Sequence, residues 1–339
     1  MKHTVIAVDI AKNVFQLHWV DPDTGEIEKL KLKRAQVMSW FTNRSPSLVL
    51  MEACGGAHDW ARRLLEQGHE VRLLAPKSVR PFVLRNKTDA TDARAIWTAG
   101  QQPGAKFVAI KTEAQQVILS LHRMRAQLMK MRVMQTNELR GLLAEFGIVL
   151  SEGHQALLKE MPKALEQAQE QLPAMFIDSL REQLQRVHAL ESDISAIERR
   201  LSQQLRQMPA CRSVAQIPGV GLLTATAVVA SMGSPTAFKD AREFSAWIGL
   251  VPKQTGTGGR VRQLGISKRG DTYLRTLLIN GARAVIRSKQ AANWPWLAGL
   301  LKRRPYNVVV AAIANKLART IWAMLAKGKS WQPHAWQAA

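Results

Sequence analysis

Short apolar segments with strand character alternate with amphipathic segments over the N-terminal third of the chain. The strand candidates, rich in β-branched and other apolar residues, are residues 4–10, 15–20, 29–33, 47–52 and 70–74. Helical spacing of apolar residues marks 36–42 and 58–67 between them. Strands interleaved with helices predict a mixed sheet that is covered by helices. We therefore expect an α/β domain over residues 1–106.

The spacing of apolar residues changes to a helical repeat after Glu113. One stripe, at alternating intervals of four and three, consists of Val117, Leu121, Met124, Leu128 and Met131. A second stripe extends from Ile177 to Met208, and segments containing Pro162 and Pro173 separate the two. Alternation of four and three is typical of helices that pack as a coiled coil. We predict two long helices that form an antiparallel coiled-coil arm or dimerisation element over residues 107–208.

The last part of the chain, residues 209–339, predicts a compact and mainly helical domain. The helix candidates are 222–232, 238–248, 272–286 and 307–325. The first of them follows the sequence IPGVG, in which Gly219 and Gly221 flank Val220. A PGVG turn between helices resembles a helix-hairpin-helix element, whose exposed amides can hold a backbone phosphate. An ordinary tight turn is the alternative interpretation.

The charge of the chain is strongly positive and unevenly distributed. It has 48 Lys and Arg against 26 Asp and Glu, a formal net charge of +22, and a pI near 10.6. Residues 209–339 carry 19 of the basic side chains and only 3 of the acidic ones. Such an excess is typical of proteins that bind polyphosphates, above all nucleic acids. The same segment is rich in Leu, Ile, Val and Trp, which argues against a disordered basic tail.

The cysteines and the hydropathy of the chain indicate the cellular compartment in which we expect the protein. The two cysteines, Cys54 and Cys211, lie far apart and match neither a disulfide framework nor a zinc-site spacing. No uninterrupted apolar run spans a bilayer, and no signal-peptide pattern precedes the first strand. We expect a cytoplasmic protein without a membrane partner.

Four acidic residues occur in settings that suit metal binding. Asp9 lies within the apolar run VIAVDI, and Glu52 ends the apolar run SLVLME. Asp89 and Asp92 are three residues apart in RNKTDATDAR, so they share one face if this segment is helical. Each acid also has an ordinary interpretation: the first two as strand-end acids bonded to backbone, the last two as partners of nearby Arg and Lys side chains.

A cluster of these four carboxylates would bind a divalent cation. Carboxylate oxygens are the ligands that Mg²⁺ and Mn²⁺ prefer. Two such ions can activate an attacking oxygen and stabilise a leaving one in phosphodiester chemistry. The spacing does not establish that the four converge, and both interpretations stay open at this point.

The sequence PKQTGTGGRVRQLGISKRGD, residues 252–271, combines glycines, hydroxyls and basic residues. Gly258 and Gly259 permit a close approach of the backbone to another molecule. The basic side chains that are candidates for phosphate binding are Arg260, Arg262, Lys268, Arg269 and, in the helix that follows, Arg275. A structural turn is the alternative interpretation of this segment.

These motifs together resemble a known family. VDIAK with Asp9, MEACGG with Glu52, and RNKTDATDAR with Asp89 and Asp92 look like the DEDD motif of the IS-one-ten insertion-sequence transposases. The IPGVG segment and GLVPKQTGTGGRVRQLGISKRGDTYLRTLLINGAR look like the C-terminal transposase domain of that family. Details of the latter point to its IS-eleven-eleven group. The resemblance covers nearly the whole chain in order.

The resemblance implies a fold and an activity. It implies an RNase-H-type, RuvC-like catalytic domain over residues 1–106, the coiled-coil arm, and a basic transposase domain over 209–339. It also implies strand exchange between donor and target double-stranded DNA, guided by a structured non-coding RNA called bridge or seeker RNA. Related enzymes are dimers that assemble into tetramers, in which the DEDD site of one subunit meets the C-terminal hydroxyl of another. In a prokaryotic cell, such a protein would associate with the nucleoid.

Carried onto this sequence, the resemblance assigns Mg²⁺ to Asp9, Glu52, Asp89 and Asp92, and the nucleophilic hydroxyl to Thr257. The family has a serine at the last position. A threonine hydroxyl can also attack phosphorus, although its β-methyl group restricts χ1 and crowds the approach. Thr255 and Ser267 supply rival hydroxyls.

Two other functions remain to be distinguished from recombination. A metal-dependent junction endonuclease would use water as the nucleophile, with Thr257 as a structural residue. An architectural DNA- or RNA-binding protein with a degenerate nuclease fold would need none of the four acids.

Overall fold

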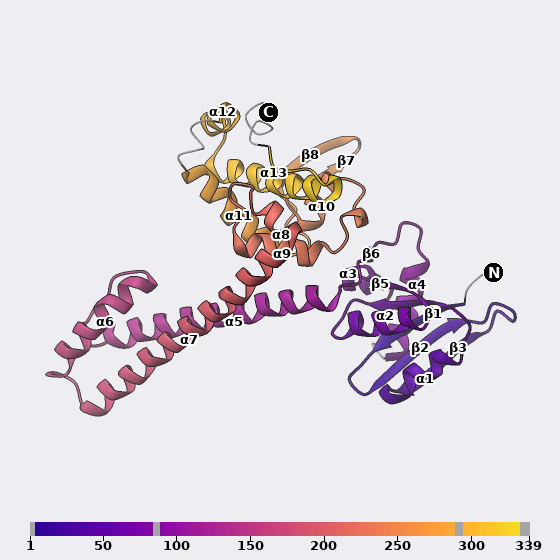
Figure 1. Cartoon of the computed structure of the whole chain (residues 1–339), viewed down its shortest axis with the longest axis horizontal. Helices are drawn as coiled ribbons and strands as arrows, with labels where there is room; N and C mark the ends of the chain where they lie inside the picture. Colours follow the sequence, from indigo (N-terminus) through magenta and orange to yellow (C-terminus); the bar gives the residue numbers. More distant parts are fainter. Residues whose placement is uncertain (1–3, 84–88, 289–293, 333–339) are drawn as a thin grey trace. The chain divides into compact units, whose positions relative to one another are not determined.

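A computed structural model describes residues 4–83, 89–288 and 294–332, with only the backbone of Asp89 and Ala90 (Figure 1). Packing divides the chain into two compact units. The first comprises Met1–Gln116 with Met232–Ala237, and the second comprises Val117–Ser231 with Phe238–Ala339. The three domains expected from the sequence, with boundaries at 106 and 208, stay a prediction.

The described part of the first unit is built on a six-stranded sheet. Across it the strands lie in the order β3 (Ile27–Lys33), β2 (Val14–Val20), β1 (Val5–Ile10), β4 (Leu48–Glu52), β5 (Glu70–Leu74) and β6 (Phe107–Val108). Strands β1, β4 and β5 are parallel neighbours, and the other pairs are antiparallel. The five predicted strands are confirmed. The two-residue β6 was too short to leave a sequence pattern.

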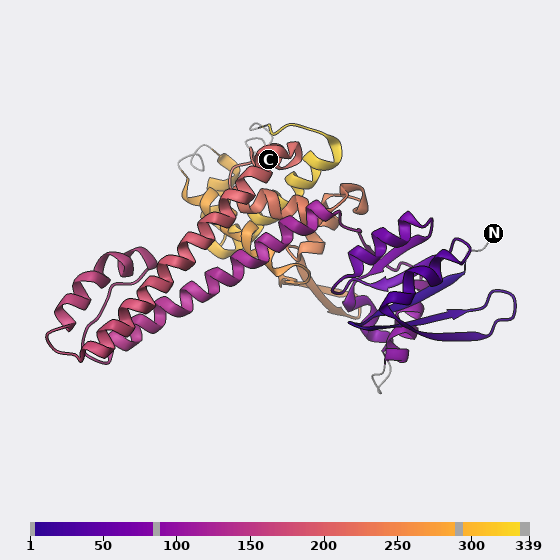
Figure 2. The same cartoon turned by 60° about the horizontal axis from the view of Figure 1, so that its bottom comes forward.

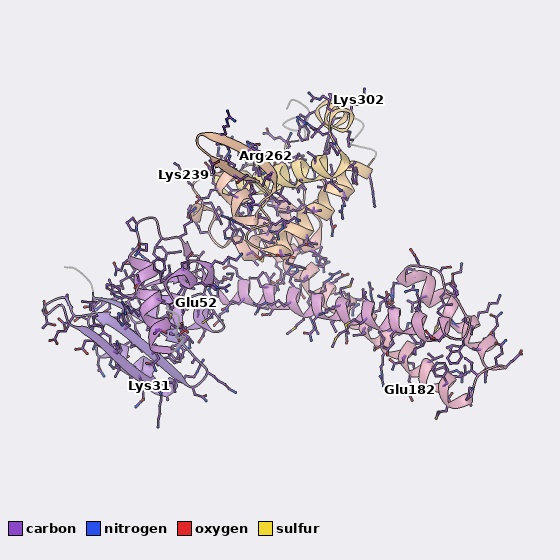
Figure 3. All side chains as sticks on the ribbon, turned by 180° about the vertical axis from the view of Figure 1, so that it is seen from behind. Lys31, Glu52, Glu182, Lys239, Arg262 and Lys302 are labelled. Carbon is purple, nitrogen blue, oxygen red and sulfur yellow. The ribbon has the colours of Figure 1, made fainter. Side chains whose placement is uncertain are left out.

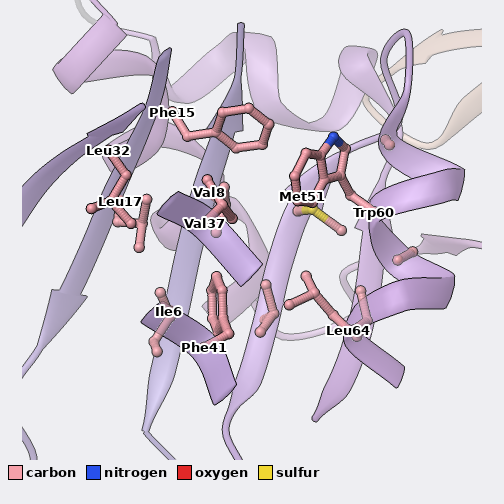
Figure 4. Close-up of a cluster of buried hydrophobic side chains, with 14 of the residues drawn as sticks. Ile6, Val8, Phe15, Leu17, Leu32, Val37, Phe41, Met51, Trp60 and Leu64 are labelled. Carbon is pink, nitrogen blue, oxygen red and sulfur yellow. The ribbon is translucent and has the colours of Figure 1, made fainter. Parts of the chain in front are cut away.

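Helices cover both faces of this sheet, because the side chains of each strand alternate between the faces. The helices are α1 (Val37–Thr42), α2 (Ala57–Glu66), α3 (Pro76–Val79) and α4 (Asp89–Gln101). One core holds side chains from β1 and β2 with Val37 and Phe41 of α1 and Trp60 and Leu64 of α2 (Figure 4). The core on the other face packs the sheet against Ala95, Ile96 and Ala99 of α4. A mixed α/β sheet domain is thus confirmed.

The second unit begins with three helices. They are α5 (Glu113–Ala144), whose first turn belongs to the first unit, α6 (His154–Ala168) and α7 (Ala174–Gln207). The two long helices are confirmed, but the Pro162 segment, expected only to separate them, is itself the helix α6. Pro162 lies inside α6, and the helix persists because Leu157, Met161 and Leu165 bury its apolar face against α5 and α7. The coiled-coil character of the arm stays a prediction.

The buried face of α5 differs from the stripe that the sequence suggested. Val117, Met124 and Met131 are 56%, 55% and 46% exposed, whereas Ile118 and His122 are buried. Ile118 packs with residues of α7 and of the C-terminal helices, so contacts made by the tertiary fold select a face about one residue away from the stripe. These three residues of the stripe are therefore largely exposed in the single chain, and their part in a coiled-coil arm or a dimerisation element stays a prediction.

The C-terminal part of the second unit is mainly helical, as expected. Its elements are α8 (Pro209–Val214), α9 (Leu222–Met232), α10 (Ala241–Ile248), α11 (Thr272–Arg287), α12 (Pro295–Arg303), α13 (Tyr306–Lys327) and the hairpin β7 (Pro252–Thr257) and β8 (Arg260–Ile266). Helix α13 contacts α8, α10, α11 and α12 (Figure 2). Its apolar side chains therefore form the centre of this part.

Among the described residues, one helix has the length and composition of a membrane span. This is α13, with 22 residues and a mean hydropathy of 1.5 over its most apolar window, of which 44% is buried. Core helices of globular domains have the same features. Asn315, Lys316 and Arg319 interrupt its apolar sequence.

Candidate active site

Asp9 and Glu52 lie next to each other at the ends of two parallel strands. Strands β1 and β4 pair in a register that places Val8 beside Met51, so the next residue of each strand is the acid. Asp9 is two residues after Ala7 in β1, and Glu52 is two residues after Leu50 in β4, so each acid points to the same face of the sheet as its partner. Ala7 and Leu50 pack under α4. They therefore lie on the face of the sheet that α4 covers, and Glu52 can be followed in Figure 3.

The nearby thiol of Cys54 responds to both charges. Burial raises the pKa of the Cys54 thiol, and the negative charges of Glu52 and Asp9 raise it further. Nearby like charges disfavour the thiolate, so the Cys54 thiol lies within the electrostatic influence of both carboxylates.

Asp92 lies on the helix that covers the same face. The indole nitrogen of Trp97 donates to the carbonyl oxygen of Val5 at 3.2 Å, which fixes α4 across β1. Asp92 precedes the buried Ala95 and Ile96 by three and four residues, so it lies on the face of α4 toward the sheet. Its Oδ1 atom is buried and has no hydrogen-bond partner among the described residues. A cation would compensate the cost of such an oxygen.

The convergence of all four acids stays a prediction. Asp89 begins α4, but its side chain lies outside the described residues, as do Arg85 and Lys87, two of the alternative partners. Among the side chains that the structure describes, no three Asp, Glu, His or Cys form a group that could hold a metal ion. The structure thus places Asp9 beside Glu52, with Asp92 on the helix above them.

Gln16 was not recognised in the sequence and lies at this site. Strands β1 and β2 pair with Asp9 directly opposite Gln16. Directly opposed residues of an antiparallel pair point to the same face, with Cβ atoms about 5 Å apart. The signal was the alternation in VFQLHWV, which puts Gln16 on the opposite face from Phe15 and Leu17, but only the strand register reveals its partner.

Thr257 lies at the tip of an exposed hairpin. Gly258 and Gly259 form its two-residue loop with φ of 56° and 80°, which matches the type I′ turn of tight hairpins. Thr257 pairs with Arg260 across the turn, and Thr255 pairs with Arg262. Both pairs lie on one face of the ribbon, because they are two residues apart along each strand.

The exposure of the hairpin leaves this face open. All six residues of β7 are exposed, as are all residues of β8 except Ile266. A threonine hydroxyl and a guanidinium on one exposed face suit the approach of a phosphodiester. Arg262 is labelled in Figure 3.

Close backbone contacts between residues 247–251 and 267–270 hold the base of the hairpin, which we call its neck. A Cβ atom on Gly249 would collide with the backbone of Arg269, and one on Gly270 would collide with the carbonyl of Trp247. The amide of Ser267 donates to Val251 O at 2.8 Å, which closes the ladder. The exposed ribbon therefore rises from a rigid base.

Arg275 belongs to this neck. Its side chain is only 8% exposed. The guanidinium donates from Nη1 to the carbonyl oxygens of Ile248 and Arg269, at 2.8 and 3.1 Å, and from Nη2 to Thr272 Oγ1 at 3.0 Å. This geometry favours a role in positioning the hairpin over a direct phosphate contact.

The other basic and hydroxyl candidates differ in exposure. Lys268 and Arg269 are exposed, and Lys268 has a φ of 54°, a rare conformation for a residue with a side chain. Ser267 Oγ is buried and has no hydrogen-bond partner among the described residues. Of the three hydroxyls, those of Thr257 and Thr255 are the accessible ones.

The PGVG turn connects α8 to α9 as the sequence suggested. Gly219 has a φ of 85°, and a Cβ atom there would lie 2.7 Å from the carbonyl oxygen of Gly281 in α11. Gly221 is exposed and has open space around it. The turn borders a shallow depression of about 520 Å³ lined by residues 215–221 and Ala284. Gly219 is thus required for packing, and Gly221 is the glycine that leaves the turn open.

Comparisons with known proteins agree with the motifs. Residues 6–148 match the family model of the DEDD transposases of the IS110 type, and residues 211–295 match the model described as "Transposase IS116/IS110/IS902 family". A probable family 20 transposase of Pseudomonas aeruginosa is 45% identical over 97% of this chain and 98% of its own length. The chain belongs to the IS110 family of insertion-sequence transposases.

Two further relatives are transposases of named insertion sequences. That of IS1111A from Coxiella burnetii is 38% identical over 97% of this chain and 91% of its own length. That of IS1328 from Yersinia enterocolitica is 37% identical over 96% and 97%. The protein is therefore a DNA-processing enzyme, which argues against the architectural alternative. DEDD domains usually use divalent metal ions.

Proposed function

We propose that this transposase is an RNA-guided recombinase that exchanges DNA strands through a covalent link between Thr257 and DNA. The observation that carries the proposal is the pairing of Asp9 and Glu52 at the ends of neighbouring parallel strands. Two adjacent carboxylates under a helix that bears further acids suit metal-assisted phosphodiester chemistry.

The chemistry of these oxygen donors suits a divalent metal ion. Asp9, Glu52 and Asp92, together with Asp89, would hold Mg²⁺ or Mn²⁺, and the unpartnered buried Oδ1 of Asp92 supports this assignment. The bound ion would polarise the phosphodiester and stabilise the charge of the leaving oxygen. The amide of Gln16, opposite Asp9, would orient that carboxylate by hydrogen bonding.

Thr257 would supply the nucleophile. Its Oγ would form a bond to phosphorus while the bond to a deoxyribose oxygen breaks, and the hydroxyl proton would pass to water. The leaving oxygen would take a proton in turn. A deoxyribose hydroxyl of the other DNA would later attack the phosphorus, displace the Thr257 Oγ and restore the free threonine, with a Holliday junction as the intermediate. Arg260 lies directly across the turn and would stabilise the charge on the phosphate.

The remaining partners of the proposal rest on the family resemblance. Donor and target DNA would pair with a structured non-coding RNA of the bridge or seeker type, which would choose the sites. The enzyme would act on DNA at the nucleoid, with the metal site of one subunit serving Thr257 of another.

The proposal includes a dimer that assembles into a tetramer. The exposed stripe of Val117, Met124 and Met131 on α5 supports this, because heptad-spaced apolar side chains suit a helix of a second copy. A Met124→Glu variant should shift the sedimentation coefficient toward the monomer, whereas Glu at the more exposed Met175, outside the stripe, should not. A dimer that survives Met124→Glu unchanged would place the interface elsewhere.

A covalent trap tests the chemistry. Protein with its co-purifying RNA is incubated with donor and target DNA and Mg²⁺, denatured, and examined for protein–DNA adducts by mass spectrometry. A phosphothreonyl peptide containing Thr257 is expected, and its loss in Thr257→Ala and Asp9→Ala. Thr255→Ala is the matched control, because Thr255 lies on the same face two residues away.

The alternative outcomes are distinct. Cleaved DNA without an adduct would assign the attack to water and leave Thr257 a structural residue, as in a junction endonuclease. An adduct at Thr255 would move the nucleophile along the strand. Thr257→Ser should keep or increase the rate, because it restores the less crowded hydroxyl that the family uses.

A further inference from the structure

The C-terminal half of α7 presents a basic face that the proposed chemistry does not use. Arg199, Arg200 and Arg206 are exposed. Together with Ala196, Ser202 and Gln203 they line a shallow, open depression of about 610 Å³. Arg199 and Arg206 are seven residues apart, so they lie on nearly the same side of the helix. We call the six residues that line this depression the α7 arginine face.

Acidic neighbours do not neutralise this face. Glu198 forms an ion pair with Arg125 of α5 at 2.6 Å. Glu191 pairs with Arg132 of α5 at 3.8 Å and with His154 of α6 at 3.1 Å. Within the part of the chain that the structure describes, no ion pair involves Arg199, Arg200 or Arg206. Glu198 and Glu191 thus pair with side chains of α5 and α6, and not with the three arginines of this face.

The face continues toward the PGVG turn. Arg212 of α8 donates from Nη1 to the carbonyl oxygen of Arg206 at 3.2 Å. Gln216, one helical turn beyond Arg212, lines the depression at the PGVG turn. The sequence has no Asp or Glu between Arg199 and Lys239. The basic face therefore extends by one residue, Arg212, into the C-terminal part of the second unit, and no acid opposes it there.

We propose that the α7 arginine face binds the phosphate backbone of double-stranded DNA. Guanidinium groups form bidentate bonds with phosphate oxygens, and the hydroxyl of Ser202 and the amide of Gln203 add neutral donors. Arg199 and Arg206 are about 10 Å apart along the helix axis, the rise of about three nucleotides of one DNA strand. The face has no aromatic side chain on which unpaired bases could stack, which favours a duplex over a single strand.

This inference rests on DNA as the substrate of the transposase. It requires neither RNA guidance nor attack by Thr257, so its test can fail or succeed independently of both. DNA held along the arm would be positioned by a surface outside the DEDD site and the hairpin.

The test measures salt-dependent binding of the full-length protein to a short DNA duplex of arbitrary sequence. The variant combines Arg199→Gln, Arg200→Gln and Arg206→Gln, since Gln keeps helix propensity and removes charge. Fluorescence anisotropy between about 50 and 200 mM NaCl should show affinity lowered about tenfold or more. The slope of log K against log salt should fall by about 2 to 3, the number of lost phosphate contacts.

Two further variants make the result interpretable. The combination Lys130→Gln, Lys159→Gln and Lys163→Gln removes the same charge from other exposed arm positions and should keep the wild-type slope. Lys at the three arginine positions should restore most of the slope, although not the bidentate contacts. Circular dichroism and oligomeric state, unchanged across the set, establish that all variants are folded.

Three results would overturn the inference. The first is a wild-type slope and affinity in the Gln variant. The second is an equal loss in the lysine control, which would reflect net charge alone. The third is unchanged duplex binding together with weakened binding of an RNA hairpin, which would assign the face to RNA.

Discussion

The imidazole Nδ1 of His122, on α5, and the hydroxyl of Tyr273, in the first turn of α11, lie 2.9 Å apart. The other ring nitrogen, Nε2, lies 2.9 Å from Thr226 Oγ1, and the Thr226 hydroxyl donates to Leu222 O at 2.8 Å. Because the Thr226 proton is used there, Thr226 accepts from Nε2–H, and Nδ1 accepts from Tyr273. One neutral imidazole thus links α5, α9 and α11.

Tyr273→Phe should lower the free energy of unfolding of the second unit by about 1 to 3 kcal/mol, because it leaves the buried Nδ1 of His122 without a donor. Urea unfolding followed by circular dichroism measures this. The matched control is Tyr306→Phe, at a tyrosine that is 42% exposed, and it should change stability by less than about 0.5 kcal/mol. An equal loss of unfolding free energy in Tyr273→Phe and Tyr306→Phe would contradict the hydrogen-bond network around His122.

Stability should fall as pH decreases through the acidic range. Burial, assisted by the charge of Arg125, lowers the pKa of His122 from 6.5 to about 4. Between these values the unfolded chain binds a proton that the folded chain does not, so the contribution is present above pH 6.5 and is lost toward pH 4. From pH 7 to 4.5 the loss should be about 2 kcal/mol.

His122→Gln separates this effect from general acid sensitivity. The variant should be less stable at pH 7 but should lose less stability between pH 7 and 4.5. His188→Gln, at an exposed histidine of α7, should keep the wild-type pH dependence. A wild-type slope in His122→Gln would assign the pH dependence to other groups.

Mg²⁺ or Mn²⁺ should stabilise the first unit if the acids bind it. A ligand at a hundred times its Kd adds about 2.7 kcal/mol, and removal by EDTA should reverse the gain. Asp9→Asn, Glu52→Gln and Asp92→Asn should abolish both the gain and strand transfer while keeping DNA binding. Asp23→Asn, at an exposed turn, is the control. A metal-induced shift that persists in Asp92→Asn would exclude that residue as a ligand.

Arg275→Lys should reduce strand transfer strongly, because an ammonium group cannot replace the forked bonds to Ile248 O and Thr272 Oγ1. The loosened hairpin should be cut faster by trypsin at Arg260 and Arg262. Arg283→Lys, at an exposed position of α11, should leave both rates unchanged. Lost strand transfer with wild-type proteolysis would point to direct contact of Arg275 with DNA.

Much of the fold follows from local sequence patterns. The β-branched runs set five strands of the first unit, and the glycine pair at 258–259 sets a type I′ turn, because only glycine adopts two successive positive φ values at low cost. The motifs around Asp9 and Glu52 indicated an acidic site before any geometry was known. Local sequence was sufficient in these cases because each depends on the conformation of a few adjacent residues.

Tertiary contacts decided the rest. Strand register placed Gln16 opposite Asp9. Packing against α7 and α9 buried Ile118 of α5, and contacts with α9 and α11 buried His122, while Met124 stayed exposed. The sequence suggested that Arg275 is an exposed cation, yet its guanidinium donates hydrogen bonds to the carbonyl oxygens of Ile248 and Arg269 at the hairpin neck. A sequence pattern states which side chains prefer burial, but the neighbours that bury them come from distant segments. Only the folded chain determines which preference is satisfied.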